Sequence, residues 1–274
     1  MTIELTNDRL RELIPNLLHE APGERTLYDK LQPWLEDNEA WLRENFLGEI
    51  EIPAALSGLV ERILVNRAFS EAVPSLDLSL TPAGFSVIST DGRAPASKER
   101  VERLIATLTS TVESGLRQLI FSLYGVEEWR NSDIGQWWLA TFIPNLNEVQ
   151  RYRGQTDMLT AYRTMRSHAL RFEQEVEEQY LGPVLGALRR QQYYRTELTP
   201  LITMIREAEL RYIGFHMRDQ KAKCPDEHEV WHLIRPVVER LKYYPDLYRQ
   251  WEAAMGEKFR PEAFKNDIKG GYYF

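Results

Sequence analysis

The sequence is poor in the features that mark several common classes of protein. It has one cysteine, so it forms no internal disulfide framework, and a reducing compartment is expected. No apolar run approaches the roughly 20 residues that a membrane-spanning helix needs, so no membrane partner is expected. The first residues, Met1–Glu12, are polar and charged, which argues against a secretory signal. No glycine-rich phosphate loop of a common spacing is present, so a nucleotide-dependent enzyme is not expected.

Basic residues are also outnumbered by acidic ones. The chain has 34 Lys and Arg against 41 Asp and Glu, a formal net charge of −7. General nucleic-acid binding needs a basic footprint, which this balance does not supply. With 274 residues, 43% hydrophobic and 27% charged, the chain is a globular protein of one or two domains that buries its own core. Composition alone therefore indicates a soluble, intracellular, globular protein.

Helical periodicity dominates the sequence, which predicts a mainly α protein built as a multi-helix bundle. Apolar residues recur at spacings of three, four and seven. They predict helices over residues 24–48, 53–73, 97–124, 157–181, 185–194, 198–217, 226–244 and 246–255. Pro33 is expected to kink or split the first, because proline removes a backbone donor. Ser97 is a suitable N-cap for the longest helix, which at 1.5 Å per residue is about 40 Å long.

One segment has a different period. Leu76, Leu78 and Leu80 alternate with polar residues, a Pro/Gly turn follows, and an apolar run then begins at Phe85. Alternation on both sides of such a turn predicts one inserted β-hairpin over residues 76–89. The short apolar stretch 137–143 is compatible with a buried helix or a buried strand, because periodicity does not separate the two.

These elements predict an N-terminal helical half over residues 1–155, a C-terminal helical half over 156–257 and an extended tail over 258–274. The two halves together are also compatible with one compact domain. The tail has no helical period and ends in Tyr272, Tyr273 and Phe274. Because exposed aromatic side chains are strong anchors at interfaces, we expect these three residues to dock on a partner. Leu76, Leu78, Leu80 and Phe85 are the other expected interaction residues.

The two halves contain segments that resemble one another. Residues 28–48 and 162–182 have the same length, and both end in an aromatic residue, leucine and glycine, at Phe46–Gly48 and Tyr180–Gly182. Two interpretations stay open. Amphipathic helices resemble each other by default, so the likeness is compatible with chance, or the chain contains two similar helical halves with the hairpin inserted only in the first.

The string His228-Glu229-Val230-Trp231-His232 matches H-E-x-x-H. On a helix its two histidines share one face and can bind zinc, while the glutamate polarises a metal-bound water. Pro236 weakens this interpretation, because it removes a helical hydrogen bond where a metal site needs rigidity. A structural zinc site using Cys224 with the two histidines lacks a fourth ligand. We predict no catalytic residue, no cofactor and no metal, and keep a zinc-dependent metallopeptidase using His228, Glu229 and His232 as an alternative.

Residues 59–108 carry a resemblance to a known group of proteins. A helix ending in Val65-Asn66-Arg67-Ala68-Phe69 leads into Val73-Pro74-Ser75-Leu76-Asp77-Leu78-Ser79-Leu80 and Thr81-Pro82-Ala83-Gly84-Phe85, and Ala94-Pro95-Ala96-Ser97 then opens a long helix. This stretch is similar to uncharacterised prophage-encoded proteins of gut bacteria that look like head-completion proteins, the head–tail connectors of tailed phages.

The resemblance implies a structural protein of a phage or prophage particle and supplies no catalytic motif. It implies a ring-like homo-oligomer below the portal, assembled in the bacterial cytoplasm, with portal or tail proteins as partners. DNA would pass close to such a ring without specific binding, and an acidic wall keeps the duplex from adhering. A helical adaptor of a non-phage bacterial assembly is the remaining alternative.

Overall fold

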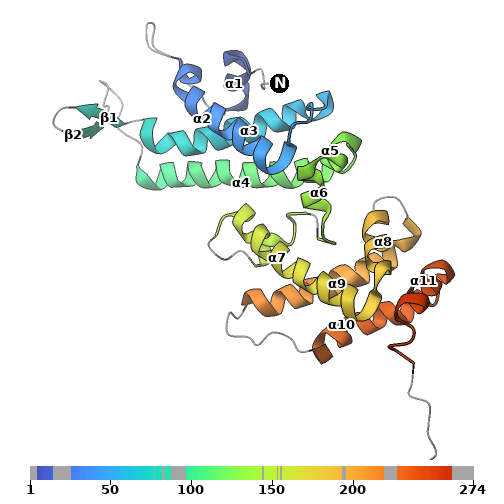
Figure 1. Cartoon of the computed structure of the whole chain (residues 1–274). Coiled ribbons are helices and arrows are strands. Elements are labelled where there is room, and N and C mark those ends of the chain that lie inside the picture. The colour runs from blue at the N-terminus through green and yellow to red at the C-terminus, as the bar shows by residue number, and fades with distance from the viewer. Residues whose placement is uncertain are drawn as a thin grey trace, which may run out of the picture. The chain divides into compact units, whose positions relative to one another are not determined.

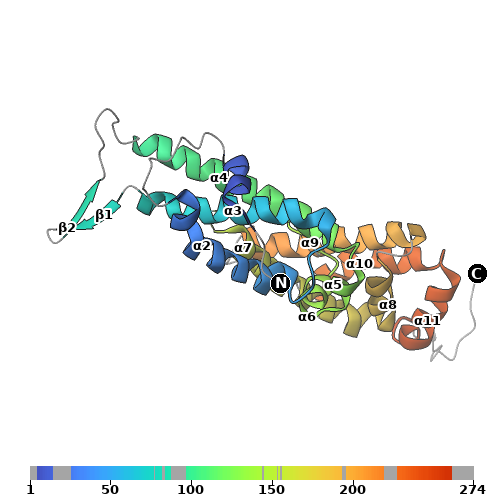
Figure 2. The same cartoon turned by 90° about the horizontal axis from the view of Figure 1, so that it is seen from above.

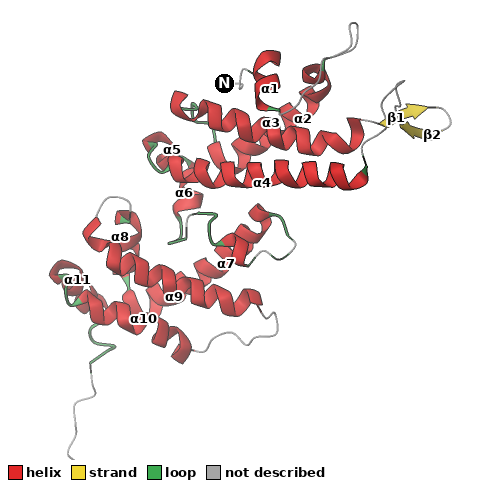
Figure 3. Ribbon diagram, turned by 180° about the vertical axis from the view of Figure 1, so that it is seen from behind, coloured by secondary structure: helices red, strands yellow, loops and turns green. Residues whose placement is uncertain are grey.

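A computed structural model describes residues 5–14, 26–76, 78–81, 84–87, 97–143, 145–152, 154, 156–192, 196–218 and 227–260. The chain divides into two compact units (Figure 1). Unit 1 comprises residues 1–140 and 144–162, and unit 2 comprises residues 141–143 and 163–274. The described part is mainly helical, as the periodicity predicts (Figure 3). The division after Tyr162 falls inside a helix, seven residues beyond the predicted division at residue 155.

The described elements include the predicted helices and three short helices, over residues 7–13, 127–131 and 133–139, that were not predicted. In unit 1 they are α1 (Asn7–Leu13), α2 (Leu27–Leu42), the π-helix η1 (Arg43–Leu47), α3 (Ala54–Leu76), β1 (Leu78–Thr81), β2 (Gly84–Val87), α4 (Lys98–Leu123), α5 (Glu127–Asn131), α6 (Asp133–Leu139) and η2 (Val149–Arg151). Helix α7 (Met158–Val176) spans the division. In unit 2 they are the π-helix η3 (Glu177–Leu181), α8 (Pro183–Gln191), η4 (Thr196–Leu198), α9 (Thr199–Arg218), α10 (Glu227–Leu241) and α11 (Pro245–Met255).

Helices α3 and α4 are the two longest helices described and lie side by side in unit 1 (Figures 1 and 2). Their apolar stripes face each other and bury residues such as Ile63, Leu64 and Leu119. The two helices approach closely at Gly115, where an added Cβ would lie 2.6 Å from Cγ1 of Ile63. Helix α4 has 26 residues and is thus about 39 Å long, close to the predicted length.

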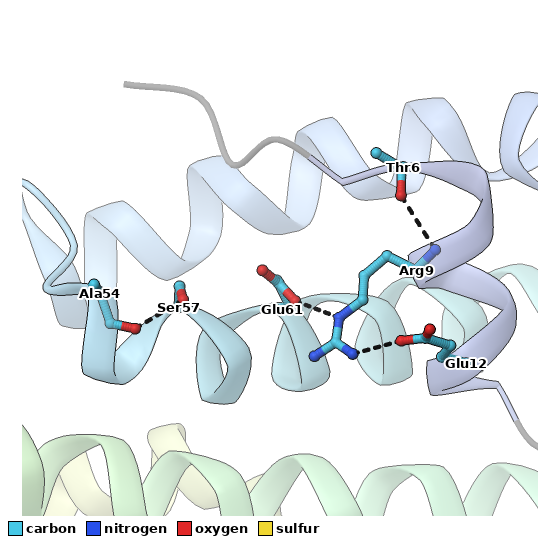
Figure 4. Close-up of polar contacts among 6 residues, drawn as sticks. All are labelled: Thr6, Arg9, Glu12, Ala54, Ser57 and Glu61. Carbon is cyan, nitrogen blue, oxygen red and sulfur yellow. Dashed lines mark hydrogen bonds and ion pairs between the residues drawn. The ribbon is translucent and has the colours of Figure 1, made fainter.

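The N-terminal helix α1 is attached to α3 by polar contacts (Figure 4). Nε of Arg9 donates to Oε2 of Glu61 on α3 at 2.8 Å, and its Nη1 donates to Glu12 at 2.7 Å. The hydroxyl of Thr6 caps the helix by accepting a hydrogen bond from the backbone N–H of Arg9 at 3.2 Å. Leu10, fully buried, supplies the apolar contact of the same helix.

Helix α2 begins with a capping box. The hydroxyl of Thr26 accepts from the backbone N–H of Asp29, and the carboxylate of Asp29 accepts from the backbone N–H of Thr26. The helix then continues through Pro33 to Leu42. Of the two effects predicted for Pro33, a kink or a split, the split is wrong, because buried Leu31 and Leu35 on either side hold the two turns against the core.

Both units contain the same local structure, and it falls on the segments that resemble each other in sequence. Helix α2 runs into the π-helix η1, and α7 runs into the π-helix η3. Each π-helix is stopped by a glycine with nearly the same backbone angles: φ 66° and ψ −150° at Gly48, φ 56° and ψ −147° at Gly182. Such angles are essentially restricted to glycine, so each glycine is required where it stands.

A tryptophan fixes each π-helix in place. The indole N–H of Trp129 donates to the carbonyl of Phe46 at 2.6 Å, and that of Trp251 donates to the carbonyl of Tyr180 at 2.8 Å. Phe46 and Tyr180 are the aligned aromatic residues two positions before the two glycines. In unit 1, Trp138 donates to the preceding carbonyl, that of Asn45, at 2.9 Å. This shared geometry supports the interpretation of two similar helical halves.

The core of unit 2 gathers apolar side chains from α7 to α11, and the buried Phe142 joins it from residues 141–143. Helix α9 contributes Leu201, Ile202 and Ile205, and α10 contributes Val230 and Ile234, which are buried to within a few per cent. After α11, the ring of Phe259 lies 5.2 Å from that of Trp231 and 5.6 Å from that of Trp251.

Three predictions need correction or completion. The predicted hairpin begins at residue 76, but Leu76 ends α3, and the strands themselves span 78–81 and 84–87, paired antiparallel with Leu80 opposite Phe85. The stretch 137–143 is helical only as far as Leu139. The predicted tail begins at residue 258, but Phe259 packs against the core of unit 2 and Lys258 donates to Gln179. Residues 261–274 lie outside the described residues.

Candidate functional site

The α3–α4 pair leaves apolar side chains uncovered at one end. The contact between Ile63 and Gly115 sets the antiparallel register, so Leu76 lies opposite the first turns of α4 (Figures 1 and 2). There Val101 and Ile105 are only half-buried and Leu104 is 37% exposed, whereas Leu108, one turn further on, is buried. We call Leu76, Val101, Leu104 and Ile105 the open end of the α3–α4 pair. A helix stripe that continues past its intramolecular partner is typical of a face that packs in an assembly.

The predicted interaction residues fall into three groups in the structure. Leu76 is half-buried at the end of α3 and forms part of the open end. The backbones of Leu78 and Leu80 belong to β1 and that of Phe85 to β2, and the structure does not describe these three side chains. Tyr272, Tyr273 and Phe274 are also outside the described residues, so their predicted docking stays a prediction.

The H-E-x-x-H string begins helix α10. His232 is exposed, while Val230 and Ile234 on the opposite side are fully buried in the core of unit 2. Pro236 lies inside the same helix, four residues after His232. The side chains of Cys224, His228 and Glu229 are outside the described residues. In the part of the chain that the structure does describe, no three His, Cys, Asp or Glu side chains converge as metal ligands.

A buried polar cluster in unit 2 was not predicted from the sequence. Glu173 on α7 accepts from the backbone N–H of Phe142 at 2.8 Å, and Nη1 of Arg189 on α8 donates to it at 2.6 Å. Nε of Arg206 on α9 donates to the carbonyl of Phe142 at 2.7 Å. The four residues thereby join three helices to residues 141–143, which indicates that the cluster positions elements of unit 2.

Glu209, one turn beyond Arg206, adds a second carboxyl group to this cluster. Its side chain is fully buried and lies beside the carboxyl of Glu173. Burial, reinforced by the nearby carboxyl of Glu173, raises the pKa of Glu209 well above its ordinary value. Burial also raises the pKa of Glu173, but Arg189 opposes this effect. We therefore assign the proton to Glu209 and the negative charge to Glu173. The sequence did contain a signal for a buried Glu209, because this charged residue falls within the apolar stripe Ile205–Ala208–Tyr212.

Replacing Glu209 by glutamine is expected to change how stability depends on pH. The folded state keeps the Glu209 proton above pH 4.5, where an unfolded glutamate loses it, so stability falls as the pH rises from there toward the folded-state pKa. Glutamine does not titrate, so Glu209→Gln should gain stability relative to the wild type over the range of pH that begins at 4.5 and extends upward toward the folded-state pKa. Denaturant unfolding of both proteins across this range measures the difference. Parallel pH profiles would contradict the assignment of the proton.

A stacked histidine pair lies elsewhere on α7 and α9. The rings of His168 and His216 are 4.9 Å apart and nearly parallel at 11°, and Tyr212 lies 4.5 Å from His216. Burial lowers the pKa of both histidines, and Arg171 lowers both further. Parallel stacked rings direct their nitrogens away from a shared metal position, so this arrangement indicates a neutral packing contact.

Three comparisons with known proteins bear on the chain. A family model described as a family of unknown function (DUF6712) matches residues 14–137, a range that lies within unit 1. No curated protein and no solved structure shows significant similarity to the chain. Among the described residues, no helix combines the length and apolar character needed to cross a membrane.

Proposed function

We propose that this chain is a structural protein of a phage or prophage particle, a head–tail connector that forms an oligomeric ring below the portal. The observation that carries the proposal is the open end of the α3–α4 pair. Two long helices carry an apolar stripe beyond the rest of unit 1, to the place where β1 and β2 are inserted. An inserted two-stranded hairpin is marginally stable alone in water, so its role is to pack on a partner.

The stretch of sequence that resembles head–tail connectors includes the open end of the α3–α4 pair. The similar stretch, residues 59–108, covers most of α3, both strands and the uncovered first turns of α4. The resemblance implies long helices that pack side by side between subunits, and the open end offers half-buried leucine, isoleucine and valine side chains for such packing. Its partners are other copies of the chain and portal or tail proteins. No catalytic step belongs to the proposal.

The inserted strands and the last residues of the chain complete the proposal as docking elements. Leu78, Leu80 and Phe85 are proposed to contact a neighbouring ring, together with Tyr272, Tyr273 and Phe274. Aromatic residues bury large apolar areas at interfaces, which makes the terminal three suitable anchors. The assembled particle, formed in the bacterial cytoplasm, is the proposed location.

Substituting Leu104 by glutamate tests the proposed connector in particles produced from the encoding element. A charge on the open end should block joining of heads and tails, because burying an unpaired carboxylate is costly. Particles carrying Leu104→Glu are therefore expected to accumulate as filled heads without tails, counted by electron microscopy. Leu104 is already 37% exposed, so the isolated variant should melt close to the wild type.

The matched control is Ser110→Glu, an equal charge change at an exposed position of the same helix. It should leave the yield of tailed particles unchanged. Mass spectrometry of purified wild-type particles should detect the chain as a component. Absence of the chain from those particles, or a normal yield of tailed particles with Leu104→Glu, would contradict the proposed function.

A further inference from the structure

The two units differ in charge, although the whole chain is acidic. Residues 1–162 contain 15 basic and 24 acidic residues, a formal charge of −9. Residues 163–274 contain 19 basic and 17 acidic residues, a formal charge of +2. Copies of the chain therefore carry an electrostatically complementary pair of surfaces if the opposite charges are concentrated at exposed sites.

Unit 1 exposes a group of carboxylates in the region where η1 lies against α6 (Figure 1). Six exposed carboxylates lie on η1, on the segment after it and in the first turns of α5 and α6. They are Glu44, Glu49, Glu51, Glu127, Glu128 and Asp133, and we call them the acidic end. None of the six forms an ion pair within the described part of unit 1. Two arginines close to these carboxylates in sequence have other partners: Arg43 pairs with Glu39 at 3.4 Å, and Arg130 donates to the carbonyl of Tyr124 at 2.6 Å.

A basic and aromatic surface lies at the C-terminal end of α10 in unit 2. A surface depression of about 480 Å³ is lined there by Pro236, Glu239, Arg240, Lys242 and Tyr243. Tyr243 is 74% exposed, and the guanidinium of Arg240 lies 4.9 Å from the centroid of its ring. We call Arg240, Lys242 and Tyr243 the basic patch.

The basic patch carries a positive charge that no ion pair within the described residues neutralises. Glu239, the acidic residue of the depression, pairs with Arg235 at 2.8 Å, so its charge is offset. Arg240 and Lys242 form no ion pair with any residue that the structure describes. Tyrosine and arginine are among the residue types that most often dominate binding energy at protein interfaces. An exposed tyrosine stacked with a free arginine is therefore a candidate contact for a carboxylate-rich surface.

We infer that the basic patch of one copy binds the acidic end of a second copy. The two surfaces match in charge, and a contact of the basic patch with itself would oppose Arg240 and Lys242 to their own copies. The contact is therefore heterologous, head to tail, which is the type of interface that closes into a ring or extends as a filament. The inference rests on the proposed function only in expecting closure into a ring.

Charge reversal on each surface tests this contact through the oligomeric state of the purified full chain. Arg240→Glu with Lys242→Glu, and separately Glu49→Lys, Glu51→Lys, Glu127→Lys and Glu128→Lys together, should each weaken self-association at least about tenfold. Sedimentation velocity at about 50 mM and 500 mM salt measures it, and wild-type association should weaken at the higher concentration. Tyr243→Ala should weaken association without changing the melting temperature. The control pair Arg190→Glu with Arg211→Glu, exposed elsewhere on unit 2, should have little effect.

Recombining the reversed surfaces makes the test decisive. Mixing the two variants, or placing all six reversals in one chain, sets a patch carrying two introduced glutamates against an end whose net charge is now positive, and should restore assembly. A wild type that stays monomeric at about 100 µM, or reversals that leave association unchanged, would overturn the inference. So would a mixture that fails to reassemble. None of these outcomes bears on whether the chain is present in purified particles, so the proposed function is judged separately.

Discussion

Replacing Gly48 by alanine is expected to lower the free energy of unfolding by about 3 kcal/mol. At φ 66° and ψ −150° the backbone is in a region that residues with a Cβ adopt only at a cost. The new methyl would also lie 2.7 Å from Cγ2 of Ile134 on α6, closer than a packed contact allows. Denaturant unfolding followed by tryptophan fluorescence measures the loss, because Trp129 and Trp138 bind the carbonyls just before this glycine.

Alanine substitutions at two other glycines separate the two causes of that loss, the backbone strain and the contact with Ile134. Gly154 has a positive φ of 58° with no atom within 4 Å of an added Cβ, so Gly154→Ala should cost only about 1 kcal/mol. Gly182 has the same backbone angles as Gly48, but its new methyl would meet the flexible side chain of Met255 at 3.1 Å. Gly182→Ala should therefore fall between the two. Equal losses for Gly48→Ala and Gly154→Ala would show that the contact with Ile134 is unimportant.

Replacing Glu173 by alanine is expected to lower the free energy of unfolding by about 3 kcal/mol, because it breaks a buried ion pair by removing one partner. The carboxylate is 3% exposed, and its loss would leave the guanidinium of Arg189 and the backbone N–H of Phe142 without an acceptor. Arg189 is itself 27% exposed and partly solvated, so the expected loss is at the lower end for such pairs. Chemical denaturation at neutral pH measures it.

The control is an ion pair of similar length on the surface of the same unit. Arg235 and Glu239 are 2.8 Å apart and more than half exposed, so Glu239→Ala should cost under about 1 kcal/mol. Equal losses in the free energy of unfolding for Glu173→Ala and Glu239→Ala would contradict the prediction that burial strengthens the Glu173 ion pair. Glu173→Ala should also remove the negative neighbour that raises the pKa of Glu209, which would flatten the pH dependence of stability.

The helices were largely predictable because their signal is local. The stripes over residues 53–73, 198–217 and 226–244 correspond to α3, α9 and α10 with boundaries a few residues away. Capping residues and glycines determine such boundaries, and they act within one or two turns of the helix end. Gly48 and Gly182 were identifiable as stops for this reason, although the π-helical turn before each was not, because no local pattern specifies it.

Other features depended on contacts between residues far apart in sequence. Pro33 was expected to kink or split a helix, and the core contacts of Leu31 and Leu35 prevent the split by holding one continuous element across it. The indole of Trp129 reaches a carbonyl 83 residues away, and that of Trp251 reaches one 71 residues away. Sequence pattern contains no information about such pairs. The likeness between the two halves was therefore ambiguous until both tryptophans were seen to bind the same position.

A mainly helical, acidic chain with two long amphipathic helices flanking a segment of different period was predictable from the amino-acid sequence. These properties follow from composition and from periodicities of two and 3.6 residues, which each short stretch expresses on its own. Three other features became known from the folded chain: Glu173 and Glu209 share one buried site, Leu104 remains partly uncovered, and Phe259 packs on the core of unit 2. Burial depends on which other elements cover a side chain, and that is a property of the folded chain as a whole.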